Sequence, residues 1–159
     1  MIRQITLQLK PYKYLPLILL FIISSCKVNL IATYNAEVSA EIQALAKTVD
    51  RFYLNMLDNT YEADNGRAFN NFTNDYVNIQ VDLNALYLKN KIRPLNENST
   101  KICKTTLDLF KKYKEEHKTK NTLSDGLIKL NRKTFSDLFY AMQVAEEAKK
   151  IISDSPTNN

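Results

Sequence analysis

The chain has a single histidine, His117, and this limits the metal and redox chemistry that it can perform. A di-iron site in a helical bundle takes a Glu-x-x-His motif from each of two helices. The residue three positions before His117 is Lys114, so this motif is absent. Met56 and His117 could together hold a haem between two helices, and this alternative stays open. The pattern favours a histidine that packs inside the protein and satisfies hydrogen bonds near a helix end.

Other catalytic patterns are missing as well. The chain has only two glycines, which leaves no glycine-rich phosphate loop. Two pairs of adjacent carboxylates are present, Glu115-Glu116 and Glu146-Glu147. Adjacent residues on a helix point about 100° apart, so neither pair forms a natural acid/base dyad. We interpret both pairs as solvated helix faces, and we predict a protein that is not an enzyme and uses no cofactor or metal.

The two cysteines lie in different surroundings. Cys103 is expected to be a small buried hydrophobic residue rather than a reactive thiol. Cys26 follows two serines and an apolar run of nine residues, 15–23. A basic segment without acids comes before this run, and together these features form the layout of a secretory signal peptide. The run is too short for a spanning helix, which needs about 20 apolar residues.

The ending Ile23-Ser24-Ser25-Cys26 resembles the lipobox of bacterial lipoproteins. The resemblance implies that the chain is cut before Cys26, which becomes the lipidated N-terminus. Residues 1–25 are then a signal peptide, and residues 26–35 are the lipidated cysteine and a short tether. Several acyl chains hold a protein durably, because each buried methylene contributes ~0.8 kcal/mol. The alternative is an uncleaved N-terminal anchor in which the cysteine is incidental.

The residue after the cysteine bears on localisation. It is Lys27, not the aspartate that resembles an inner-membrane retention signal in enterobacteria. No acidic run follows Cys26 of the kind that directs some lipoproteins to the cell surface. We therefore expect a protein of the bacterial cell envelope, anchored on the periplasmic face of the outer membrane.

Composition and periodicity favour helices. Glycine and proline are scarce, with 2 and 4 residues, whereas turn-rich β folds need more of both. Apolar residues follow a heptad pattern in two predicted helices, at about 36–59 and from 67 or 71 to 92. The first pattern comprises Val38, Ile42, Leu45, Val49, Phe52 and Met56. The second comprises Phe69, Phe72, Tyr76, Ile79, Leu83 and Leu86.

Several details of the first two helices can also be predicted. Asn35 or Thr33 is a plausible N-cap of the first helix. Three apolar residues lie off the second heptad pattern and suggest a broader buried face: Val77, Val81 and Leu88. Asn90 falls near the heptad pattern, and we expect it to be exposed at the helix end.

Two further helices follow Pro94. The third is predicted at about 100–118, capped by Asn98 or Ser99. The segment 122–125 opens the fourth helix with the spacing of a capping box, and this helix ends near residue 152. Short connections make successive helices antiparallel neighbours. The sequence thus predicts an all-α fold, an up-down-up-down four-helix bundle over residues 36–152, with a disordered tail at 153–159.

Charge is unevenly distributed along the chain. Removal of residues 1–25 lowers the net charge from +5 to +2, because three bases and no acids are lost. Residues 27–88 carry 4 bases and 8 acids, and residues 89–159 carry 15 bases and 9 acids. The basic half could meet anionic lipid headgroups or an acidic partner. Nucleic acid is not an expected partner of an exported protein.

These features predict a non-enzymatic envelope lipoprotein, attached to the membrane through Cys26, whose helical bundle binds another protein. It would serve as an accessory of a larger envelope machine. One alternative is an immunity-type lipoprotein that neutralises a toxin, for which the charge asymmetry is suitable. A second is a cofactor carrier, metal carrier or enzyme built inside the bundle.

Overall fold

The computed structural model describes residues 31–153 of the chain. The predicted signal peptide, Cys26 and the tail beyond residue 153 lie outside it. The described residues form α2 (Ala36–Asp58), η2 (Phe69–Phe72, a 3-10 helix), α3 (Thr73–Lys91), α4 (Glu97–Lys120) and α5 (Asp125–Ser153). This part contains no strand.

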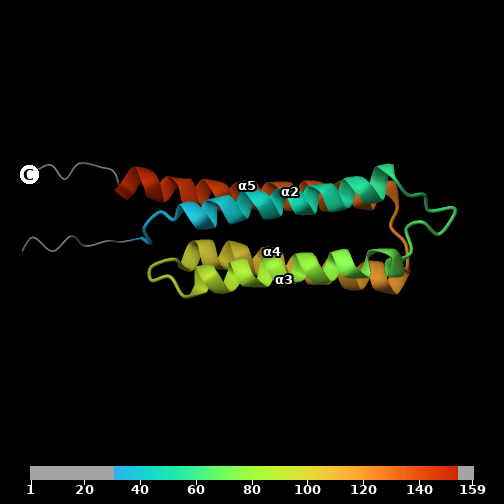
Figure 1. The fold of residues 1–159 in the computed structure, drawn as a ribbon, viewed down its shortest axis with the longest axis horizontal. Helices are drawn as coiled ribbons and strands as arrows, with labels where there is room; N and C mark the ends of the chain where they lie inside the picture. Colours follow the sequence, from blue (N-terminus) through green and yellow to red (C-terminus); the bar gives the residue numbers. More distant parts are fainter. Residues whose placement is uncertain (1–30, 154–159) are drawn as a thin grey trace, which may run out of the picture. The chain divides into compact units, whose positions relative to one another are not determined.

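The four α-helices run antiparallel to one another in sequence order. Figure 1 shows α2 and α5 side by side in one layer and α3 and α4 in the other. Around the bundle, the neighbouring pairs are α2–α5, α5–α4, α4–α3 and α3–α2. The connections α3–α4 and α4–α5 are short, as an up-down-up-down topology requires. The predicted all-α four-helix bundle is confirmed.

The core contains every residue of the two predicted heptad patterns, together with buried residues of α4 and α5. Its centre is aromatic. The ring centroids of Phe52 and Tyr76 are 4.9 Å apart, those of Tyr76 and Phe110 are 5.6 Å apart, and those of Phe110 and Phe135 are 5.8 Å apart. Such edge-to-face and tilted pairs stabilise beyond the area that they bury. These four residues come from α2, α3, α4 and α5, so the rings join all four helices.

The helix ends agree only in part with the sequence predictions. Asn35 is the N-cap of α2, and its side chain accepts a hydrogen bond of 3.0 Å from the Val38 N–H. Neither Asn98 nor Ser99 caps α4, which begins earlier, after Asn96. The predicted capping box at residues 122–125 is wrong. The helix α5 begins at Asp125, and Ser124 Oγ, in place of the Thr122 hydroxyl, accepts a hydrogen bond of 3.4 Å from the Leu127 N–H.

Asn90 is buried, with 1% of its surface exposed, so the prediction of an exposed helix end is wrong. Its Nδ2 donates to the Leu86 carbonyl at 3.0 Å. Asn96 donates to both the carbonyl and the side-chain oxygen of Asn90, at 3.0 and 2.9 Å. Asn96 follows the turn after α3, so the burial of Asn90 depends on how the α3–α4 connection folds back.

Candidate functional site

The first described residues are bound to the end of the bundle. The Ala32 N–H donates to the Leu95 carbonyl at 2.9 Å. Arg93 Nη2 donates to the Thr33 carbonyl, and the Asn35 N–H donates to Glu146 Oε1 at 2.9 Å. The last part of the predicted tether is therefore attached to α5 and to the α3–α4 connection.

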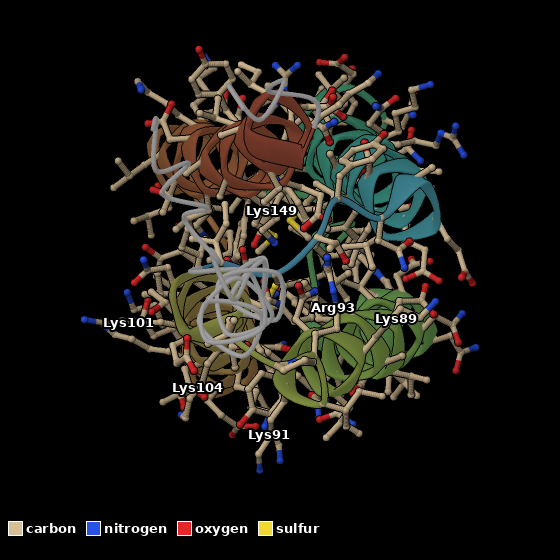
Figure 2. The ribbon with its side chains drawn as sticks, turned by 90° about the vertical axis from the view of Figure 1, so that its left-hand side faces the viewer. Lys89, Lys91, Arg93, Lys101, Lys104 and Lys149 are labelled. Carbon is tan, nitrogen blue, oxygen red and sulfur yellow. The ribbon has the colours of Figure 1, made fainter. Side chains whose placement is uncertain are left out.

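Glu146 is the centre of this attachment. Its side chain is 1% exposed and accepts hydrogen bonds from both Nη atoms of Arg93, at 3.0 and 2.9 Å. Lys149 Nζ lies 2.6 Å from Glu146 Oε2 and 2.6 Å from Asn96 Oδ1. We call Asn35, Arg93, Asn96, Glu146 and Lys149 the Glu146 cluster. Figure 2 looks along the bundle from this end, with Arg93 and Lys149 between the helices and Lys91 and Lys101 pointing outward.

The surroundings of Glu146 keep it ionised. Burial by itself raises the pKa of this carboxyl, but hydrogen bonds from Arg93, Lys149 and the Asn35 N–H outweigh burial and lower the pKa below its usual range. A buried carboxylate that accepts several charged donors is stable only while all of them are in place. The cluster is thus suited to holding three chain segments together, and it offers no free group for acid/base chemistry.

The prediction of a solvated Glu146 is therefore wrong. Glu146 continues the buried face of α5, four residues after Met142 and three before Lys149. Glu147 is partly exposed and accepts hydrogen bonds from Ser39 Oγ at 2.7 Å and Gln143 Nε2 at 2.9 Å. The spacing 142-146-149 was a usable signal for burial, but the sequence did not show which residue would neutralise the charge.

Cys103 lies near this cluster and behaves as predicted. It is 3% exposed, and its sulfur lies 4.0 Å from that of Met142. Burial raises the pKa of the Cys103 thiol to about 12. The thiol therefore stays protonated at neutral pH, and a protonated thiol is a poor nucleophile and metal ligand.

His117 is buried at the opposite end of the bundle, with both ring nitrogens hydrogen-bonded. Nε2 lies 2.8 Å from the Arg67 carbonyl, which can only accept, so Nε2 carries the proton. Nδ1 then accepts from the Tyr76 hydroxyl at 2.9 Å. The prediction of a histidine with satisfied hydrogen bonds near a helix end is confirmed. Met56 is also buried, but haem ligation by His117 would require one of its two hydrogen bonds to break.

We expect His117 to titrate below its usual pKa of 6.5. Burial lowers the pKa of the ring and outweighs the opposing hydrogen bond to Arg67. The unfolded chain then binds a proton at this ring more readily than the folded chain does. The contribution of His117 to stability should therefore be complete above about pH 6.5 and be lost as the pH falls through the folded-state pKa. NMR titration of the one histidine ring would measure this pKa, and urea unfolding at several pH values would measure the linked stability. A ring pKa of 6.5 or higher would contradict the prediction.

The outer face of α3 is apolar and exposed. Val77, Val81 and Leu88 are 46%, 61% and 47% exposed, so the prediction that they widen the buried face is wrong. Ile92, just after α3, is 82% exposed. Within the described bundle α3 packs mainly against α2 and α4, and these helices cover its opposite side. An apolar row on the surface marks an interaction site more often than a scattered single residue does.

Two kinds of site are not found in residues 31–153. No three His, Cys, Asp or Glu side chains are grouped so that they could hold a metal ion. No helix in this part is long and apolar enough to cross a membrane.

The arrangement defines the class of protein as an antiparallel four-helix bundle, with a buried ionic cluster at one end and an apolar outer face on α3. Searches against protein-family models, curated proteins and solved structures found no match.

Proposed function

We propose that the chain is a non-enzymatic lipoprotein of the bacterial envelope whose bundle is a protein-binding domain that acts through the outer face of α3, as an accessory of a larger envelope assembly. The exposed row Val77, Val81, Leu88 and Ile92 is the observation that carries the binding role. Burying such side chains against a partner contributes about 25 cal/mol per Å² of apolar area. A helix that has apolar residues on two sides is typically covered by other protein on both of these sides.

The proposed anchor fits the attachment of residues 32–35. Six residue steps separate Cys26 from Ala32, and an extended chain of that length spans at most about 20 Å. If Cys26 carries the acyl chains, the end of the bundle that holds the Glu146 cluster stays close to the membrane surface. We place this surface on the periplasmic side of the outer membrane, because Lys27 follows the cysteine.

The anchor is tested by replacing the cysteine. In a bacterium with the lipoprotein pathway, Cys26→Ala should leave the precursor uncleaved and remove fatty-acid labelling completely, because no other thiol stands at the processing site. Cys103→Ala is the matched control and should label like the wild type, since Cys103 is buried. Labelling of the Cys26→Ala protein at the wild-type level would rule out the lipid anchor.

The binding role is tested by crosslinking in intact cells. A photoreactive amino acid at position 81, on the outer face of α3, should form protein adducts. The same residue at position 112 should not, because Lys112 lies on α4 and outside the outer face of α3, although 65% of its side chain is exposed. Equal adduct yields at both positions, or none at position 81, would count against the outer face as a binding surface.

A further inference from the structure

The outer face of α3 has the spacing of a helix that packs against one other helix. Val77, Val81, Asn84 and Leu88 are separated by 4, 3 and 4 residues, and all four are exposed. Ile92 lies one turn beyond Leu88. We call these five residues the outer row of α3. A 4-3-4 spacing keeps apolar side chains in register along a helix pair.

The two edges of the outer row differ in charge. On the edge toward α2, Lys89 binds Glu37 and Glu41 of that helix, while Asp75 and Asp82 line the grooves between α2 and α3. Arg51 also lines one of these grooves. This edge therefore has four acids against two bases.

The edge toward α4 is basic. Lys91, Lys101 and Lys104 line the hollow between the end of α3 and the start of α4, together with Glu97. Figure 2 shows these three lysines at the outside of the bundle. Lys114 donates to Gln80 of α3 at 3.1 Å, and Lys104 pairs with Asp108. Four lysines thus stand against two acids, so the outer row separates an acidic edge from a basic one.

We propose that the outer row of α3 binds the outer row of a second copy of this chain, with the two helices parallel. Two parallel helices related by a two-fold axis along their length place opposite edges against each other, so the acidic edge of each copy meets the basic edge of the other. An antiparallel pair would place like edges together, and like charges repel. The parallel arrangement also points both Glu146 clusters in one direction, as two chains anchored in one membrane require.

The contact is expected to be weak in solution. It joins one helix of each copy and the side chains beside it, which is less surface than a stable interface of standard size buries. Anchoring both copies in one membrane raises their effective concentration and favours the pair. This inference rests on the proposed binding role by naming the partner, whereas the identity of the anchor is tested separately by labelling of Cys26.

Thiol crosslinking of the full chain in membranes tests the pairing. Val81→Cys and Leu88→Cys should each form a dimer with a short bismaleimide, because a parallel two-fold pair places each residue opposite its own copy. The dimer yield should exceed that of Lys112→Cys by about tenfold, since position 112 meets its copy only by random collision. Cys103 is buried and should not react. The chain without an added cysteine is the control that measures any crosslinking through Cys26.

Three results would overturn the proposal. A yield at position 81 no higher than at position 112 would show that the rows do not meet. Crosslinking of Val77→Cys to Ile92→Cys, without crosslinking of Val77→Cys to itself, would show an antiparallel pair. Adducts at position 81 that contain only a different protein would retain the binding role and replace the second copy by that partner.

Discussion

Replacing Glu146 by alanine is expected to lower the free energy of unfolding by about 3–5 kcal/mol, the range found when one partner of a buried ion pair is removed. The reason is that Arg93 and Lys149 stay inside, with 14% and 7% of their side chains exposed, and lose the carboxylate that neutralises them. The Asn35 N–H loses its acceptor at the same time. Urea unfolding at pH 7 would measure the change.

Glu147→Ala is the matched control, because this neighbouring carboxylate is partly exposed. Its replacement should cost about 1 kcal/mol or less, the usual contribution of one hydrogen-bonded group near the surface. A Glu146→Ala protein as stable as the Glu147→Ala protein would mean that the Glu146 cluster does not hold the bundle end together.

The same carboxyl gives a pH dependence whose sign can be stated. The pKa of Glu146 is lower in the folded chain than in the unfolded chain, where it is near 4.5. Its contribution to stability is therefore complete above about pH 4.5 and is lost as the pH falls through the folded-state pKa. Glu146→Gln should flatten the stability profile in this acid range, and unchanged profiles would contradict the pKa assignment.

The second large effect is expected in the aromatic core. Phe52 is 6% exposed, and its ring lies 4.9 Å from those of Tyr53 and Tyr76. Leu83 is 1% exposed on the facing helix. Phe52→Ala and Leu83→Ala should each lower stability by about 2 to 5 kcal/mol, through lost burial plus a cavity. Lys112→Ala, on the solvated side of α4, should change stability by less than about 0.5 kcal/mol.

These three variants would be compared by their midpoints of urea unfolding at fixed pH. Helices of this length are marginal in water when isolated, so the bundle depends on its buried faces for stability. If Phe52→Ala and Leu83→Ala unfold at the wild-type midpoint, the two heptad patterns are not the core.

The helices and the core were determined by the sequence itself. The heptad patterns predict the buried faces of α2 and of η2 with α3, and of the two predicted N-cap candidates, Asn35 and Thr33, Asn35 caps α2. The burial of Cys103 and the satisfied hydrogen bonds of His117 were also predicted. The buried faces and the cap depend on residues within a few turns of helix, where a repeat of 3.6 residues places apolar side chains on one side. The hydrogen-bond partners of His117 were decided by packing, because Tyr76 and Arg67 lie 41 and 50 residues away in the chain.

The functional features were decided by the tertiary structure. Glu146 is buried because Arg93, 53 residues earlier in the chain, reaches it from the α3–α4 connection, and no local pattern identifies so distant a partner. The apolar residues Val77 and Val81 are exposed because α3 has two helical neighbours and two apolar sides. Periodicity shows that both sides are apolar, but only packing determines which one the bundle covers, since the free energy of burial depends on the surface that lies opposite.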